Sequence, residues 1–136
     1  MALATAPPPP VRCTMSRIEG SAEYSRRRAL AAAAQARIDA APGARHRIRD
    51  LATALDVSPF HLAHVFRAVS GLSIHQYLLR VRMRAALSRL EAGEANISRL
   101  ALDLGFSSHS HFTAVFQRHV GASPAAVRRG RVRRRA

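Results

Sequence analysis

Arginine is the side chain that offers this sequence the most chemistry. All 22 basic residues are arginine, against 8 acidic residues, and the formal net charge is +14. A guanidinium group keeps its charge at physiological pH and presents a planar fork of N–H donors that fits phosphate oxygens. Coding bias can explain part of the choice of arginine over lysine, but it does not explain the scarcity of acidic residues. The charge therefore predicts a polyanionic partner, with nucleic acid favoured over an anionic membrane surface.

Histidine and cysteine offer less. His61 and His64 are spaced i, i+3, and His109 and His111 are spaced i, i+2, but no third ligand accompanies either pair. The sequence therefore predicts no metal site. The single cysteine, Cys13, supplies neither an internal disulfide nor a multi-thiolate zinc site, which makes the reducing cytoplasm the default compartment. Because the sequence shows no nucleophile and base set and no glycine-rich phosphate loop, we expect no enzyme activity and no cofactor.

The elements that position these side chains are expected to be helices. The chain has 136 residues, of which 48% are apolar and only 5% aromatic, without tryptophan. This composition suits a small all-α domain better than a β-sandwich, and the length excludes a large enzyme fold. No stretch approaches the roughly 18 to 20 apolar residues that span a bilayer, so we expect no membrane-bound form.

The two ends of the chain differ from its middle. Residues 1–20 contain four consecutive prolines and are expected to be a disordered leader, and residues 131–136 are a basic tail. Residues 21–41 are rich in helix formers and stop at Pro42-Gly43. The apolar face of this first helix is predicted to contain Tyr24, Leu30, Ala34 and Ile38.

The middle of the chain contains an internal repeat. Leu51 aligns with Leu100 at a separation of 49 residues, and Phe66 aligns with Phe116 at a separation of 50, so one residue is inserted near the turn. The aligned positions are Leu51-Ala52, Leu55, Val57-Ser58, Leu62, Val65-Phe66, Gly71 and Ser73 in the first copy, and Leu100-Ala101, Leu104, Phe106-Ser107, Phe112, Val115-Phe116, Gly121 and Ser123 in the second.

Each copy predicts a helix, a tight turn and a second helix. The turn falls at Asp56 or Gly105, residues that tolerate a positive φ. Ser58 in the first copy, and Ser107 or Ser108 in the second, can cap the helix that follows. We place these helix-turn-helix units at residues 48–70 and 97–120; in such units the second helix enters the DNA major groove. Four phenylalanines are assigned to the core, namely Phe66, Phe106, Phe112 and Phe116, whereas Phe60 is compatible with either core packing or exposure to DNA.

One continuous helix is predicted between the two units. Residues 73–92 contain no proline or glycine. At about 1.5 Å per residue this connector spans about 30 Å, and major grooves on one face of B-DNA recur every ~34 to 36 Å. The connector is therefore long enough to hold two recognition helices in successive grooves.

These residues resemble the DNA-binding domain of the AraC/XylS family of bacterial transcription regulators. The second unit carries the most specific part of the resemblance, in Gly-Phe-Ser-Ser at positions 105–108 and Gly-Ala-Ser-Pro at 121–124; the first unit and the connector YLLRVRMRAA agree with it. The resemblance implies a seven-helix domain over residues 21–130 that binds an asymmetric DNA site. It also implies activation of transcription through contact with RNA polymerase.

By position, the resemblance assigns base reading to Phe60, Ala63 and His64 in the first recognition helix and to His109, Ser110, Thr113 and Ala114 in the second. Ala63 and Ala114 depart from the polar readers that the family often has there, so specificity is expected to lean on thymine methyl groups and on DNA shape. Asp56, at the usual turn glycine, and Arg89, at a usually apolar position, predict a weaker first unit and connector end.

The phosphate contacts are expected at Ser58, Arg67, Ser108, His111 and Arg118. Arg80, Arg82 and Arg84 on the connector fit either phosphate contact or a solvated face. The sequence predicts a sequence-specific regulator that is monomeric and associated with the nucleoid in the cytoplasm. Two alternatives stay open: a non-specific basic nucleic-acid binder, and the DNA-binding part of a larger ligand-responsive regulator.

Overall fold

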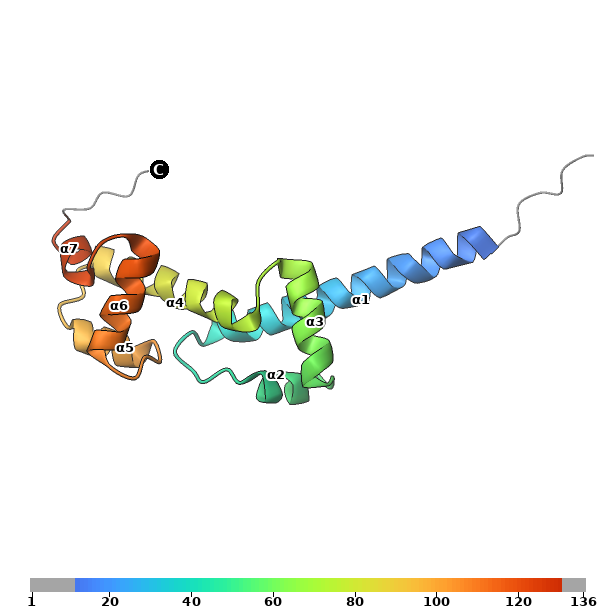
Figure 1. The fold of residues 1–136 in the computed structure, drawn as a ribbon, viewed down its shortest axis with the longest axis horizontal. Helices are drawn as coiled ribbons and strands as arrows, with labels where there is room; N and C mark the ends of the chain where they lie inside the picture. The colour runs from blue at the N-terminus through green and yellow to red at the C-terminus, as the bar shows by residue number, and fades with distance from the viewer. Residues whose placement is uncertain (1–11, 131–136) are drawn as a thin grey trace, which may run out of the picture.

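A computed structural model describes residues 12–130, and this part of the chain contains seven α-helices and no strand. The predicted all-α fold of two helix-turn-helix units joined by a long helix is confirmed (Figure 1). The helices are α1 (Arg12–Ala40), α2 (Ile48–Ala54), α3 (Pro59–Ser70), α4 (Ile74–Glu91), α5 (Ile97–Asp103), α6 (His109–Val120) and α7 (Pro124–Arg128).

The first helix is longer than predicted. It begins at Arg12 and has 29 residues, so the expectation of a disordered leader is wrong for residues 12–20. The proline run ends at Pro10, and a single glycine inside a helix, here Gly20, costs only about 1 kcal/mol. The remaining leader residues, 1–11, and the predicted basic tail, 131–136, lie outside the described residues.

Local turn chemistry explains why the two units have the same shape. Asp56 takes a left-handed φ of 57° in the first turn, and Gly105 takes a φ of 83° in the second. The hydroxyl oxygen of Ser58 accepts a hydrogen bond from the His61 backbone N–H at 3.1 Å. Ser108, rather than Ser107, caps α6 in the same way. These contacts satisfy backbone donors that a helix start would otherwise leave without a partner.

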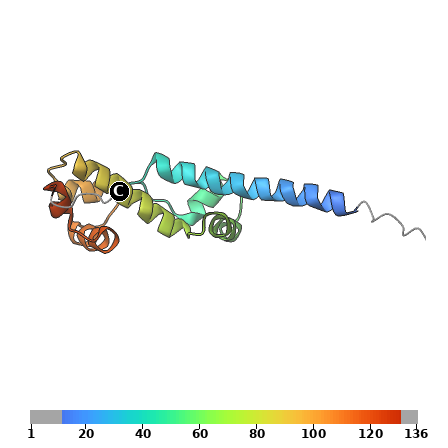
Figure 2. The ribbon, with the colours of Figure 1, turned by 90° about the horizontal axis from the view of Figure 1, so that it is seen from above.

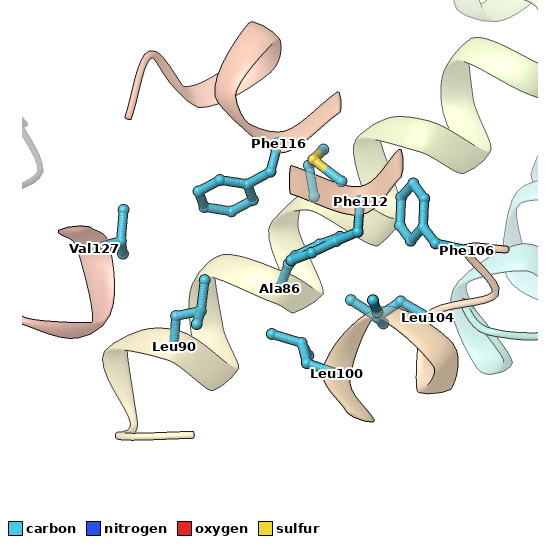
Figure 3. Packing of buried hydrophobic residues seen from close by; sticks show 10 residues of the cluster. Ala86, Leu90, Leu100, Leu104, Phe106, Phe112, Phe116 and Val127 are labelled. Carbon is cyan, nitrogen blue, oxygen red and sulfur yellow. The ribbon is translucent and has the colours of Figure 1, made fainter. Parts of the chain in front are cut away.

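Each unit has its own core, and α4 contributes to both. In the first unit (α2 and α3, packed against α1), Ile74 and Leu78 of α4 join a buried cluster that includes Leu62 and Phe66. In the second unit (α5 and α6, packed against α7), the later α4 residues Met83, Ala86 and Leu90 join the core phenylalanines Phe106, Phe112 and Phe116 (Figure 3). The assignment of all four core phenylalanines is confirmed.

The first helix packs through one short stretch of its length. Ala31, Ala34 and Ile38 are buried, but Tyr24 is 60% exposed, which corrects its predicted place on the buried face. Toward its N-terminus, α1 extends away from the rest of the helices (Figure 1). The buried face of α1 therefore begins more than one turn after Tyr24.

The second helices of the two units face the same way. Viewed from above, α3 and α6 are seen nearly end-on along one side of the molecule, and α1 lies along the opposite side (Figure 2). The connector α4 runs between these two sides of the molecule. Ser73 and Gln76 form a capping box at its start. Its observed range, Ile74–Glu91, confirms the predicted continuous helix.

Candidate nucleic-acid interface

The exposed face of α3 is largely apolar and aromatic. Phe60 is 84% exposed, which settles the question left open by the sequence in favour of the surface. Its ring is stacked on that of His64, with 6.5 Å between the ring centroids and 11° between the planes. Ala63 and Arg67 are exposed on the same face, one and two turns from Phe60. The predicted readers Phe60, Ala63 and His64 are thus brought together on one surface.

A recess of about 510 Å³ lies beside this face, between α3 and the start of α4. It is lined by His46, Ile48, Phe60, Ala63, His64, Arg67, Ser73, Ile74, His75 and Leu78, so none of its lining residues is acidic. His46 and His75 were not predicted from the sequence, because they reach the recess from the loop before α2 and from α4. The recess combines apolar surface with side chains that attract anions.

The exposed face of α6 is more polar. His109, Ser110 and Ala114 are exposed, and the Nδ1 atom of His109 lies 2.9 Å from the Ser98 hydroxyl oxygen on α5. Thr113 is half-buried, and its Oγ1 atom is covered and has no hydrogen-bond partner in the described structure. Three of the four predicted readers are therefore accessible, whereas the Thr113 hydroxyl oxygen is covered.

The alignment of the two repeats identifies a further exposed residue on α6. Gln117 occupies the position that Arg67 has in α3, 50 residues earlier, and it is exposed. A glutamine side chain can form two hydrogen bonds to adenine in the major groove. The internal repeat in the sequence therefore contained the information needed to identify Gln117 as a candidate contact residue.

The predicted phosphate ligands fall into three groups. Ser58 and Ser108 use a hydroxyl lone pair to cap their helices, which leaves each hydroxyl hydrogen available as a donor. Arg67 and Arg118 are exposed near the ends of α3 and α6. His111 is more restrained, because its ring packs edge-on against Phe106 at a centroid distance of 5.6 Å and its Nδ1 lies 3.5 Å from the Ser107 hydroxyl oxygen.

The connector arginines divide between surface and structural roles. Arg80 and Arg84 are exposed, whereas Arg82 donates hydrogen bonds to backbone carbonyl groups of the α1–α2 loop. Arg89 forms ion pairs with Glu94 at 2.9 Å and with Asp103 at 3.1 Å. The hydrogen bond from Arg89 is the main cause that lowers the pKa of the Glu94 carboxyl. Arg89 therefore ties the end of α4 to α5, which accounts for a charged residue at this position.

This geometry, with two capped helices exposed on one side of a basic chain, agrees with the comparisons to known proteins. The helix-turn-helix domain family matches residues 51–130, more than half of the chain. The fold is shared with a transcriptional regulator of the AraC-type DNA-binding class from Chromobacterium violaceum, with a TM-score of 0.72 and 24% identity over 78% of this chain and 95% of that one. The chain is an AraC-type helix-turn-helix protein.

Two further comparisons agree with this assignment. The AraC-type chain is 33% identical over 87 residues to the Msm operon regulatory protein of Streptococcus mutans, covering 64% of this chain and 31% of that protein. It shares its fold with the DNA-binding domain of AdpA, a global transcriptional factor solved in complex with a target DNA, with a TM-score of 0.68 and 26% identity over 74% of this chain and 90% of that one. The chain thus spans about a third of the length of its Streptococcus relative.

The family assignment makes this part of the chain an AraC-type helix-turn-helix domain, and the similar AdpA domain was solved in complex with a target DNA. Over residues 12–130, none of the helices is long and apolar enough to cross a membrane. Within the same range, no three histidine, cysteine or acidic side chains form a group that could hold a metal ion.

Proposed function

We propose that this AraC-type protein is a sequence-specific transcription activator that inserts α3 and α6 into successive major grooves on one face of the duplex. The observation that carries the proposal is that both recognition helices are exposed on the same side, at the two ends of one continuous helix (Figure 2). Charge alone gives no reason for two helices to be capped and oriented in this way. The similar AdpA domain was solved in complex with a target DNA, which supports DNA as the ligand.

In the first half of the DNA site, Phe60, Ala63 and His64 contact base edges. Phe60 and Ala63 offer apolar surface that fits the C5-methyl group of thymine, and His64 supplies the hydrogen-bonding group. Next to them, the recess takes the sugar-phosphate strand at the edge of the groove, where Arg67 and His75 face it. We therefore expect a thymine-containing first element.

In the second half of the site, His109, Ser110, Thr113 and Ala114 contact base edges. The Oγ1 of Thr113 has no hydrogen-bond partner in the described structure, and a hydrogen bond to a base edge would satisfy it, which favours a role as a reader. Because Ala63 and Ala114 have no hydrogen-bonding side chain, the proposed specificity rests partly on DNA shape.

Phosphate contacts from Ser58, Arg67, Ser108, His111 and Arg118 set the register of the protein on the duplex without reading its sequence. The regulator is proposed to act as a monomer at the nucleoid in the cytoplasm and to contact RNA polymerase. Its two recognition helices are unequal in composition, so an asymmetric site suits one copy of the chain.

Selection of bound duplexes from a random pool, at about physiological salt and with competitor DNA, tests the proposal. We expect an asymmetric site with two short elements about one helical turn apart, bound at least ~10³-fold more tightly than a scrambled duplex. If no sequence is enriched and the affinity only falls with salt, the chain is a non-specific basic DNA binder and the base-reading roles are wrong.

A further inference from the structure

Arg82, in the middle of α4, holds the loop that joins α1 to α2. Its Nε atom donates a hydrogen bond to the Pro42 carbonyl oxygen at 2.8 Å, and its Nη2 atom donates one to the Ala44 carbonyl oxygen at 3.0 Å. These partners are about 40 residues earlier in the chain. Burial of the guanidinium lowers the pKa of Arg82 from its usual value.

The same loop touches the turn of the second unit. A methyl group added at Gly43 would overlap the carbonyl oxygen of Asp103 at the end of α5. One added at Gly105 would lie 2.6 Å from Arg82 Nη2 and 2.8 Å from the Gly43 carbonyl oxygen. The guanidinium of Arg82 also lies 5.7 Å from the centroid of the Phe106 ring. Arg82 is therefore packed between a loop of the first unit and the turn of the second.

This contact supplies a second connection between two separate cores. The two units have separate cores, and each core packs on a different part of α4. The contact between the 42–44 loop and the 103–105 turn joins the units away from the α4 axis, so it opposes movement of one unit relative to the other. The two hydrogen bonds from the Arg82 guanidinium, one part-buried and one exposed, are charge-assisted and hold this contact.

We propose that Arg82 is a positioning residue that fixes the relative orientation of α3 and α6 and thereby the spacing between the two DNA elements that the protein accepts. This inference rests on the proposed two-groove binding. Each added base pair moves the second element by about 3.4 Å and turns it by about 35°. If the two units are held rigidly, the protein should bind the duplex with the altered spacing much more weakly. If the units move relative to each other, the affinity should fall much less.

The spacing assay measures binding to duplexes in which one base pair is added or removed between the two selected elements. Wild-type protein is expected to lose about tenfold or more in affinity per base pair. Arg82→Met keeps the length of the side chain but removes its donors, and it is expected to reduce that loss to about threefold or less and to weaken binding to the unaltered site. Binding to each element alone should stay within about twofold.

Arg84→Met is the matched control, since Arg84 is exposed on the same helix and its substitution removes the same charge. It is expected to leave the spacing preference unchanged. Arg82→Lys, which keeps the charge and one donor, should give an intermediate preference. If Arg82→Met keeps the wild-type spacing dependence, the inference is wrong.

A second measurement needs no DNA and so separates this inference from the proposed function. Spin labels on Ala68→Cys in α3 and His119→Cys in α6, in a Cys13→Ser background, report the distance between the units by double electron–electron resonance. Both labelled positions are exposed. We expect a narrow distribution for the wild-type and Arg84→Met chains and a clearly broader one for Arg82→Met. Equal widths overturn the inference even if a specific DNA site exists.

Gly43→Ala provides an independent variant if Arg82→Met does not fold. Gly43 has no left-handed φ, so the added methyl group acts through its overlap with the Asp103 carbonyl oxygen. The distance distribution should shift or broaden in Gly43→Ala, with a retained helical circular dichroism spectrum. If it does neither, the contact does not set the orientation. If the pool selection enriches no site but the distances respond as expected, the positioning role stands and the proposed sequence-specific function fails.

Discussion

The five phenylalanines separate stability from DNA recognition at the level of single residues. Phe112 is fully buried, with its ring centroid 5.2 Å from that of Phe106, whereas Phe60 is 84% exposed. We expect Phe112→Ala to lower the free energy of unfolding by about 3–5 kcal/mol, because it removes a buried ring and leaves a cavity. Phe60→Ala should change it by less than about 0.5 kcal/mol.

Urea unfolding and DNA titration together check this pair. Phe60→Ala is expected to weaken binding to the selected duplex by roughly five- to tenfold, through loss of an apolar contact worth about 1 kcal/mol. A large loss of stability in Phe60→Ala, or unchanged DNA affinity, would contradict the surface role assigned to Phe60.

Tyr77 gives the first unit a pH-dependent contact. Its hydroxyl donates a hydrogen bond to Asp39 at 2.7 Å, and burial, followed by this bond, raises the pKa of Tyr77 to about 12 from the usual 10.0. Because the pKa of Tyr77 is raised on folding, the folded state keeps the phenol proton to a higher pH than the unfolded state does. The contribution of this hydrogen bond to the free energy of unfolding is therefore complete below pH ~10 and is lost as the pH rises toward 12. We expect the wild-type free energy of unfolding to fall more steeply over this range than that of Tyr77→Phe, as measured by urea titrations at several pH values. Parallel pH profiles would exclude the contact.

At the level of elements, the first turn has Asp56 where the second has Gly105, and we expect substitutions at these two positions to change the free energy of unfolding in opposite directions. Asp56 has a φ of 57°, a region that glycine occupies without strain, and Gly105 is its counterpart. We expect Asp56→Gly to raise the free energy of unfolding by about 0.5–1 kcal/mol. Gly105→Ala should lower it by at least about 2 kcal/mol, since the methyl group meets Arg82 and the Gly43 carbonyl oxygen at a left-handed φ. Thermal and urea unfolding check both, and a stability loss in Asp56→Gly would show that the aspartate side chain has a favourable role.

The elements that were predicted correctly are those with local signals. Ser58, Gly71 and the leucine-alanine pairs fix helix starts, helix ends and buried faces within a few residues of themselves, so the repeat and both units followed from the sequence. The partners of Arg82 lie instead some 40 positions earlier in the chain, and the exposure of Tyr24 depends on where the packed stretch of α1 begins. No periodicity encodes such contacts, because they arise only when α1, its loop and the second unit are assembled. For the same reason, His46 and His75 were missed at the recess.

For the whole molecule, the distribution of arginine determines how binding responds to salt. Arg67 and Arg118 lie on the two recognition helices, while Arg26 is on α1, along the opposite side of the molecule (Figure 2). Each phosphate contact contributes about 0.9 to the slope of log affinity against log salt concentration. We therefore expect Arg67→Met and Arg118→Met each to reduce the slope by about one unit and to weaken binding to specific and scrambled duplexes alike.

Arg26→Met is the matched control for this prediction, because the Arg26 side chain is 74% exposed and its substitution removes the same charge. Its salt slope should equal that of the wild type if DNA lies along the α3 and α6 side. Fluorescence anisotropy titrations from about 50 to 300 mM salt measure all four slopes. Equal reductions in the three variants would mean that binding responds to the net charge of +14 and not to the position of the charges, which is the behaviour of a non-specific polyanion binder. A reduction confined to Arg67→Met and Arg118→Met requires contact through both units at once, since each residue belongs to a different one.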